Sequence, residues 1–216
     1  MGLKDHNEEL VRKGWGIVEK NQQRIYHLVM DMLTFGKERQ PALRNADLNE
    51  TVGDVCELLA ARAQELNVCM EWQPPPALPP MSFDPEGIHR AVLNIVGNAL
   101  DAVEGRENGR VTVTAGYDPE TCYVSVSVSD NGPGIAPELM AQIFNIFAST
   151  KGARGTGIGL AVSQKIIREH GGDIRVSNSP GAGATFTLEW PLIDAVAVSE
   201  TPGPAEIPER AVGEAP

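Results

Sequence analysis

The sequence predicts an α+β fold, namely a two-layer α/β sandwich with a mixed, mainly antiparallel sheet, preceded by one long helix. Apolar residues recur at helical spacing over residues 7–35, 47–67 and 84–103. Residues 109–130 and 172–191 each contain two runs that alternate in period two, which is typical of antiparallel strand pairs. Long helices and alternating strands in one chain favour a layered α+β domain.

The length of 216 residues allows one domain of ordinary size plus an appendage. The apolar fraction is 42%, and no apolar run approaches the roughly 18 to 20 residues that span a bilayer. The start, MGLKDHNEEL, has no basic segment followed by an apolar stretch, so we expect no secretory signal and a cytoplasmic location. A formal charge of -11 without a dense basic run disfavours nucleic-acid binding.

The three cysteines, Cys56, Cys69 and Cys122, are odd in number and widely spaced. This pattern fits neither a disulfide framework nor a CxxC metal site. We therefore expect three buried thiols.

Residues 7–35 are expected to form a long amphipathic helix, although Gly14 and Gly16 weaken its first half. A single helix cannot bury an apolar stripe, so this one should pack on another helix or on a second copy of itself. Residues 36–47 indicate a connector. The stripe consists of Leu10, Ile17, Ile25, Leu28, Met32 and Phe35.

The second helix is expected to follow the connector, with Asn49 as its N-cap. Residues 68–72 are a short strand candidate, which the proline cluster at 74–80 closes. The third helix should begin at Asp84, where a capping carboxylate precedes a proline, and run to about Val103. The strand pair at 109–118 and 121–130, a short helix at 137–147, a glycine-bearing loop at 148–156, a helix at 157–170 and a closing hairpin at 172–191 follow.

Three segments carry residues suited to chemistry, and the first holds Asn94, Asn98 and Asp101 on one helix face. Amide oxygens on that face can hold the oxygen-rich shell of Mg²⁺, directly or through water. Asparagine pairs in helices also hydrogen-bond neighbouring backbone, and taken alone this pair favours that structural role.

The second segment, Asp130 to Ile135 with the sequence DNGPGI, follows a strand directly. A carboxylate at a sheet end can accept a hydrogen bond from an amino group, and Gly132 and Gly134 let the backbone approach a flat ligand. The same letters also make a good turn, so both interpretations stay open.

The third segment, Thr150 to Leu160 with the sequence TKGARGTGIGL, is a loop that leads into an amphipathic helix. Its amides and the helix dipole suit phosphate. Leu160 stands where the last glycine of a GxGxxG motif would be, and no GxxxxGK[ST] loop occurs, so Rossmann and P-loop sites are excluded.

Taken in chain order, four segments resemble the N, G1, F and G2 boxes of the GHKL ATPase superfamily. They are NIVGNALDA, DNGPGI, IFNIF and GTGIGLAVSQKIIREHGG. The chain looks closest to two-component sensor histidine kinases, particularly the nitrogen-regulation-like group with a short lid of the form FASTKG. The resemblance covers roughly residues 47–192. It implies that residues 1–46 are part of a dimerisation hairpin with its linker. The composition of residues 193–216, rich in Pro, Ala and Glu, predicts a disordered tail.

The resemblance implies a Bergerat-type sandwich that binds ATP and Mg²⁺. Asp130 would accept a hydrogen bond from the adenine amino group, and Asn98 would be the main Mg²⁺ ligand. Asn94 and Lys151 would approach the phosphates. Further nucleotide contacts are implied for Asp101, Gly132, Gly134, Ile135, Phe147, Thr150, Gly155, Thr156, Gly157, Gly159, Leu160 and Thr185.

Some of these roles have plainer alternatives. Thr185 would support Asp130 through a water. Phe144 and Phe147 are more simply packing residues at the base of the lid. His89 and Arg90 precede the N box, where a basic side chain either reaches phosphate or lies on the surface.

Asn94 separates subclasses by mechanism. Superfamily members that hydrolyse ATP with water carry a glutamate general base at this position. An amide cannot take a proton, so transfer to a neutral imidazole, already nucleophilic, is favoured over water attack. This indicates a histidine kinase, with Asn94, Asn98 and Lys151 as catalytic residues, over a gyrase-like ATPase.

The chain departs from the family in its acceptor histidine, because no HE(L/I)(R/K)NPL pattern occurs around His6, His27, His89 or His170. Residues 8–38 resemble the second helix of the dimerisation hairpin, so we expect a chain that begins after the acceptor helix, binds ATP and does not autophosphorylate. A response-regulator receiver domain and a second copy of the chain are the implied partners. The alternatives are an anti-sigma-type Ser/Thr kinase, which the long N-terminal helix disfavours, and a non-catalytic ATP-dependent binding module.

Overall fold

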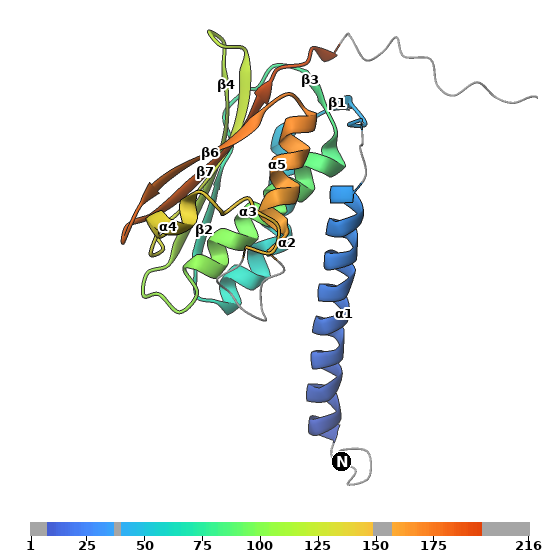
Figure 1. Ribbon diagram of the computed structural model, residues 1–216, viewed down its shortest axis with the longest axis vertical. Helices are drawn as coiled ribbons and strands as arrows, with labels where there is room; N and C mark the ends of the chain where they lie inside the picture. The colour runs from blue at the N-terminus through green and yellow to red at the C-terminus, as the bar shows by residue number, and fades with distance from the viewer. Residues whose placement is uncertain (1–7, 37–39, 149–156, 196–216) are drawn as a thin grey trace, which may run out of the picture.

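The computed structural model describes residues 8–36, 40–148 and 157–195 (Figure 1). The helices are α1 (Glu8–Gly36), α2 (Leu48–Glu65), α3 (Pro85–Ala102), α4 (Pro137–Met140) and α5 (Gly159–Glu169). The strands are β1 (Arg44–Ala46), β2 (Cys69–Gln73), β3 (Met81–Phe83), β4 (Arg110–Asp118), β5 (Tyr123–Asp130), β6 (Asp173–Ser179) and β7 (Gly183–Pro191).

The main sheet has five strands in the order β2-β4-β5-β7-β6. The β2–β4 pair is parallel and the other pairs are antiparallel. Helices α2, α3 and α5 lie on one face of this sheet (Figure 1). The expected two-layer α+β sandwich with a mixed, mainly antiparallel sheet is therefore confirmed.

The core lies between the helices and the sheet because every second strand residue points into it. In β5, Val124, Val126, Val128 and Asp130 are buried, and the residues between them are half-buried. The same alternation runs along β7, and helix α3 contributes its buried stripe from the other side. A polar residue thus occupies the last inward position of β5, at the edge of an apolar core.

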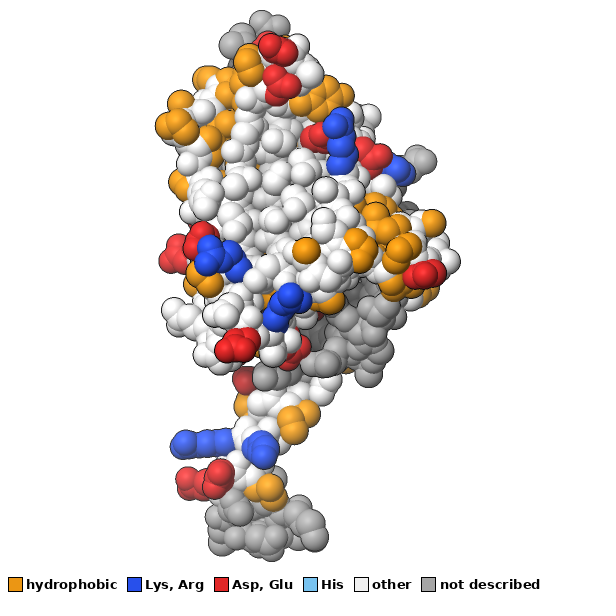
Figure 2. Space-filling model, turned by 90° about the vertical axis from the view of Figure 1, so that its left-hand side faces the viewer, with side chains coloured by type: hydrophobic (Ala, Val, Ile, Leu, Met, Phe, Trp, Pro, Cys, Tyr) orange, Lys and Arg blue, Asp and Glu red, His pale blue; other side chains and the backbone are white. Residues whose placement is uncertain are grey.

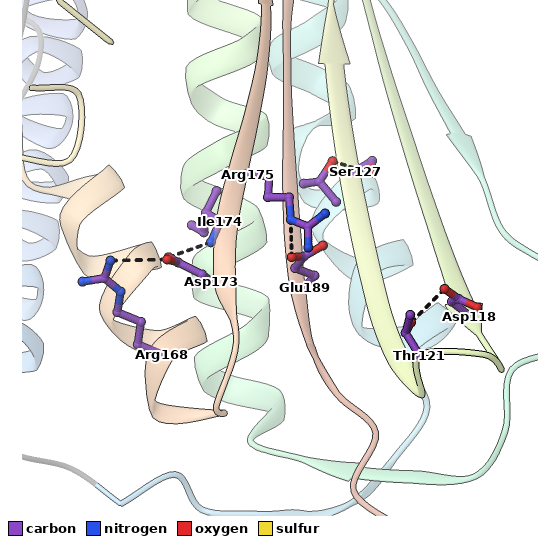
Figure 3. A network of polar contacts seen from close by, with 9 residues as sticks. Asp118, Thr121, Ser127, Arg168, Asp173, Ile174, Arg175 and Glu189 are labelled. Carbon is purple, nitrogen blue, oxygen red and sulfur yellow. Dashed lines mark hydrogen bonds and ion pairs between the residues drawn. The ribbon is translucent and has the colours of Figure 1, made fainter. Parts of the chain in front are cut away.

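The opposite face of the sheet carries the serines and threonines of β5 and β7. In Figure 2 the middle of this face is white, and the charged side chains lie around it. The charged groups near it pair with one another, since Arg175 contacts Glu189 and Arg168 contacts Asp173 at 3.4 Å (Figure 3). The serines and threonines of β5 and β7 hydrogen-bond across the strands, as Ser127 does with a 2.9 Å contact. This face is solvated in the described part of the chain.

The starts of α2 and α3 follow capping chemistry. Asp84 caps α3 as predicted, because its Oδ1 accepts from the Gly87 N–H at 3.1 Å and Pro85 takes the first helical position. The expected N-cap of α2 at Asn49 is wrong. Asp47 caps it instead, accepting from the Asn49 N–H at 2.7 Å, because extended backbone at Asp47 starts the helix two residues earlier.

A two-stranded antiparallel sheet joins the connector to the end of the proline-rich segment, and the sequence did not predict it. Strand β1 pairs with β3 in the register Arg44 to Phe83. The Ser82 hydroxyl donates to Asn45 Oδ1 at 2.7 Å, and the Ser82 N–H donates to the Ile193 carbonyl at 2.8 Å. The described end of the chain is therefore held beside β3, while residues 196–216 lie outside the described residues.

Two further expectations need correction. Only Cys56 is buried, and burial raises the pKa of its thiol to about 11, whereas Cys69 and Cys122 are exposed at a strand start and in a turn. The helix expected over 137–147 is a single turn, α4, followed by further turns.

Helix α1 extends away from the sandwich, and its C-terminal part packs near α5 (Figure 1). Many of its described apolar side chains are exposed, including Trp15 at 64% and Ile25 at 62%. A partner helix for this stripe therefore stays a prediction. None of the helices in the described ranges is long and apolar enough to cross a membrane.

Candidate nucleotide-binding site

Asp130 lies at the C-terminal end of β5 with its side chain on the core face, 8% exposed. Its Oδ1 accepts from the Gly132 N–H at 2.8 Å and from the Ala184 N–H at 3.4 Å. Both backbone bonds end on one oxygen, and an ionised carboxylate has about four acceptor positions, so Oδ2 has capacity for a ligand donor. The arrangement suits recognition of an amino group at the edge of the core.

Burial raises the pKa of Asp130 above its usual value of 3.8, and the two backbone bonds and the Arg106 charge oppose this shift. The folded chain therefore holds the proton more tightly than the unfolded chain does. Stability from this group is fully present below the unfolded pKa and is lost as pH rises through the folded pKa.

The direction of this pH dependence gives a prediction for Asp130→Asn. The asparagine side chain cannot ionise and keeps an oxygen for the Gly132 N–H. The free energy of unfolding of the variant, relative to the wild type, is expected to increase as pH rises from about 4 to 7. Urea unfolding of both proteins at several pH values measures it. A difference that is flat or shrinks with rising pH would contradict the burial of a charge at this position.

The loop after Asp130 is pressed against α3 and fastened to the β6–β7 turn. A Cβ on Gly132 would lie 2.7 Å from Asp130 Oδ1 and 3.0 Å from the Ala102 carbonyl oxygen. The Asn178 side chain accepts from the Ile135 N–H and donates to the Ile135 carbonyl, both at 2.7 Å. The glycine expected to allow close approach is thus required by the packing of the loop itself.

Asn178 is a site residue that the sequence analysis missed. It comes from β6, far along the chain, and the only signal is an amide side chain as the first residue of the NSPG turn. Sequence alone does not say which loop such an amide will hold. In the structure it fixes Ile135 at the edge of the candidate adenine pocket.

Gly134 adopts φ of +71° and packs tightly, because a Cβ there would lie 2.8 Å from the Ser179 carbonyl oxygen and 2.9 Å from Asn178 Oδ1. Gly181 has a similar φ of +86° but no atom within 4 Å of a Cβ. Gly134→Ala is therefore expected to lower the free energy of unfolding about 1–3 kcal/mol more than Gly181→Ala, since only the first adds overlap to backbone strain. Urea unfolding of the two variants measures the difference, and equal losses would show that the loop is not tightly packed.

The N-box residues lie on the face of α3 that leads to α5. Asn94 Nδ2 donates to the Gly159 carbonyl at 3.3 Å, so this amide touches the first residue of α5. Asn98 follows one turn later on the same face. The structure thus brings Asn94 beside the start of α5, where the helix dipole favours phosphate.

Asp101, a third residue of this face, forms an ion pair with Arg62 from α2. The Arg62 guanidinium also lies 3.9 Å from where a Cβ on Gly97 would be. Because the carboxylate is engaged with Arg62, this arrangement favours a role for Asp101 in holding α2 on α3 over the nucleotide contact expected from sequence.

The two ends of the lid segment meet at Phe147 and Gly157. The Phe147 N–H donates to the Gly157 carbonyl at 2.9 Å, and a Cβ on Gly157 would lie 2.7 Å from the Phe147 backbone. The Phe147 side chain is 70% exposed, so its expected packing role is wrong, whereas Phe144 packs partly buried against the core. The expected contacts of Thr150, Lys151, Gly155 and Thr156 fall outside the described residues and stay predictions.

Thr185 takes another place than the resemblance implied, whereas the nucleotide contact implied for Leu160 stays a prediction. The Thr185 hydroxyl donates to Ser129 Oγ at 2.9 Å, and strand alternation puts both on the sheet face opposite to Asp130. Leu160 packs partly buried against the core. The geometry therefore disfavours the water-mediated link from Thr185 to Asp130, whose nearer neighbour on β7 is Ala184.

His89 lies apart from these residues. It lines a hollow of about 270 Å³ with Arg44, Thr51, Asp54, Pro85 and Glu86, near the start of α3. Asp130 and Gly132 lie near the opposite end of that helix, beside Ala102. The phosphate contact considered for His89 is not favoured by this placement.

A buried carboxylate behind a glycine loop, two asparagines on the facing helix and a lid anchored at both ends define a nucleotide-binding domain of the ATPase class. The chain belongs to the family described as histidine kinase-, DNA gyrase B-, and HSP90-like ATPase, whose profile matches residues 83–194. Within that family it carries the catalytic-domain type of the sensor histidine kinases, as its relatives show, so the resemblance found in the sequence is confirmed.

The sensor histidine kinase ZraS of Escherichia coli is 33% identical over 82% of this chain, which spans 37% of the length of ZraS. Full-length ShkA, crystallised in complex with AMPPNP, is 30% identical and superposes with a TM-score of 0.74 over 85% of this chain and 39% of ShkA. The histidine kinase ThkA, crystallised in complex with the response regulator protein TrrA, is 29% identical with a TM-score of 0.68, over 84% of this chain and 51% of ThkA.

Proposed function

We propose that this chain binds Mg-ATP and transfers the γ-phosphoryl group to a histidine side chain, as the catalytic domain of a two-component sensor histidine kinase. The observation that carries this proposal is Asp130, a buried carboxylate whose two backbone bonds both end on Oδ1. The adenine amino group is a donor that Oδ2 can accept. The AMPPNP bound to ShkA, an ATP analogue, supports the same ligand class for this fold.

The residues present fit a magnesium ion that brings most of its own ligands. Asn98 offers a hard amide oxygen, while the Asp101 carboxylate is engaged with Arg62. The described residues contain no cluster of three or more His, Cys, Asp or Glu suited to a metal. Mg²⁺ keeps several waters and is commonly bound through one or two protein groups plus substrate phosphates. Bound there, it would neutralise charge on the phosphates.

The chain's own residues would hold and orient the nucleotide. Asp130 fixes the adenine, the start of α5 at Gly159 faces the phosphates, and Asn94 ties that start to α3. Asn94 cannot accept a proton, so the site lacks a base for water at the N-box position. This chemistry favours transfer to an imidazole over hydrolysis.

The acceptor is proposed to be a histidine of a separate dimerisation helix. His170 is 3% exposed, and both of its ring nitrogens are engaged, by the Asp84 N–H and the Ile166 carbonyl. Such a buried ring cannot reach a bound γ-phosphate. His6 lies outside the described residues, and His27 lies on α1 without a described side chain.

Residues 1–46 are proposed to be the second helix of a dimerisation hairpin with its linker, and 47–192 the catalytic domain. The exposed stripe of α1 supports this division, because an apolar helix face of that length needs a partner. It also favours a sensor kinase over an anti-sigma-type Ser/Thr kinase. We propose a second copy of the chain and a receiver domain as partners, the latter supported by the ThkA complex with TrrA.

The test is phosphotransfer from γ-labelled ATP to a purified dimerisation hairpin of a nitrogen-regulation-type sensor kinase. We expect acid-labile, alkali-stable label on the hairpin, and none when its acceptor histidine is replaced by alanine or when Asp130→Ala is used. Acid-stable label would instead indicate a hydroxyl acceptor. Binding of ATP without transfer to any acceptor would instead indicate a non-catalytic ATP-dependent binding module.

A further inference from the structure

His170 lies at the C-terminal cap of α5, at the other end of that helix from the proposed phosphate site. It is 3% exposed and packs edge-on against Trp190, with ring centroids 6.4 Å apart. The Asp84 N–H donates to its Nε2 at 3.0 Å, and its Nδ1 lies 2.8 Å from the Ile166 carbonyl oxygen. A backbone N–H can only donate, so Nε2 is the acceptor and the proton sits on Nδ1.

Asp84 connects this ring to two other elements. It is 6% exposed and caps α3, with Oδ1 accepting from the Gly87 N–H. Its other oxygen, Oδ2, accepts from the Ala42 N–H at 3.4 Å. Ala42 belongs to the connector that leads from α1 into β1. One buried residue therefore joins the end of α5, the start of α3 and the connector.

The connector is held at a second point close by. Strand β1 pairs with β3, and the Ser82 hydroxyl donates to Asn45 Oδ1 at 2.7 Å. Ser82 is two residues before Asp84 in the chain. The position of the connector is thus set by residues 82–84, whose own position depends on His170 through the Asp84 N–H.

Helices α3 and α5 are also joined along their length toward the proposed phosphate site. The buried Ser163 hydroxyl lies 2.9 Å from the Gly159 carbonyl oxygen and 3.3 Å from the Ala91 carbonyl oxygen, so its single hydrogen can be donated to either of them. Asn94 donates to Gly159 at 3.3 Å. A ligand that displaces the start of α5 would therefore also displace His170 at the other end, because α5 is packed and hydrogen-bonded to α3 along its length.

We propose that His170 is a positioning residue. When α5 moves, His170 moves the Asp84 backbone with it through their hydrogen bond, and Asp84 in turn moves the connector between α1 and β1. The proposal rests on the proposed function for its ligand, because ATP would be the molecule that shifts the α5 start. Its consequence is that nucleotide binding and the placement of α1 are coupled. Linkage then requires that the α1 placement affect nucleotide affinity by the same factor.

The test uses the full chain and measures amide hydrogen exchange at Ala42 and along β1, with and without AMPPNP and Mg²⁺. In the wild type we expect nucleotide to change the exchange rate at Ala42 on the order of fivefold or more. His170→Leu keeps bulk but removes both ring hydrogen bonds, and its Ala42 exchange should not respond to nucleotide. His170→Gln can place an amide oxygen near the Asp84 N–H and should restore the response.

Two variants separate this role from simple stabilisation. Asp84→Asn keeps an oxygen for the Gly87 N–H but presents an amide group toward Ala42, so it should lose the response at Ala42 without altering α5. Arg168→Gln, an exposed change in the last turn of α5, is the matched control and should respond like the wild type. For His170→Leu, loss of the coupling should change AMPPNP affinity by no more than the factor by which nucleotide changes Ala42 exchange in the wild type, while the phosphotransfer rate to a supplied hairpin should fall further than the affinity, a split that mere destabilisation does not give.

The outcomes distinguish this inference from the proposed function. If the wild type binds AMPPNP and Ala42 exchange does not change, or if His170→Leu and Asp84→Asn respond like the wild type, the coupling is overturned. If the wild type binds no nucleotide, the proposed function fails. The inference is then judged without ligand, where His170→Leu must speed exchange at Ala42 relative to Arg168→Gln, and equal rates would overturn it.

Discussion

Replacing Asp130 with alanine is expected to raise the Kd for ATP by about 100-fold or more while the domain stays folded. Under the proposed function the buried carboxylate accepts a hydrogen bond from the adenine amino group, and its loss would leave that amino group without a partner inside the site. Hydrogen bonds to charged groups contribute about 1.5–3 kcal/mol each, and an unpaired buried donor adds a further cost. Titration with a fluorescent ATP analogue, competed by ATP, measures the change.

Asp130→Asn is the sharper companion variant. It keeps an oxygen for the Gly132 and Ala184 N–H groups but presents an NH₂ group where Oδ2 lies, so donor would face donor. Binding should be lost to a similar degree, without the loss of the two backbone bonds. Glu120→Gln, in the exposed β4–β5 turn, is the matched carboxylate control and should bind like the wild type. Full affinity in either Asp130 variant would end the adenine assignment.

Asn98→Ala is expected to retain adenine binding and to lose phosphotransfer on the order of 100-fold or more, as single preorganised contacts to a reacting group do. Adenine recognition is proposed for Asp130, on the strand side, whereas Asn98 lies on the facing helix and would act on the metal and phosphates. The transfer rate to a supplied hairpin and the Kd for ATP are measured on the same preparation.

Asn98→Asp serves as the control for metal ligation. A carboxylate is also a hard oxygen ligand, so this variant should keep much more activity than Asn98→Ala and should bind Mg-ATP. Equal transfer rates for Asn98→Ala and the wild type would remove Asn98 from the metal site. Equal losses in Asn98→Ala and Asn98→Asp would point to packing on α3 as the cause.

Long periodic elements were predictable from the sequence because many residues repeat the same signal. Helix α3, its cap at Asp84 and the strands β4 to β7 lie where the alternation and the capping letters indicate. Strands β1 and β3 were missed because three residues cannot show a period of two. They form because the connector and β3, which are far apart in the sequence, lie side by side in the fold, and a local sequence pattern does not show this.

In the candidate site, too, some residues could be predicted from the sequence and others could not. Asp130, Asn94 and Gly134 could be singled out because their letters occur in ordered motifs. The structure puts Asp130 and Gly134 close together at the end of β5 and in the loop that follows, and it puts Asn94, on α3, beside the start of α5. Asn178 and Arg62 could not be singled out, because each acts through a contact with a distant segment. Thr185 lies on the opposite face because strand alternation, not motif membership, decides where a side chain points.

The stability of α1, which extends away from the sandwich, should also depend on packing against a partner. Its described apolar residues are largely exposed, and helices gain most of their stability from packing an amphipathic face. Association through this face should therefore increase the helicity of residues 8–36. This agrees with the proposal that the helix belongs to a dimerisation hairpin.

The measurement that tests the central claim most directly is equilibrium binding of ATP to the purified chain, with and without Mg²⁺, for the wild type and Asp130→Asn. The account predicts saturable binding by the wild type that is tighter with Mg²⁺, and loss of binding in the variant with the fold retained. Absence of binding in the folded wild-type chain, or equal affinity in the variant, would contradict it.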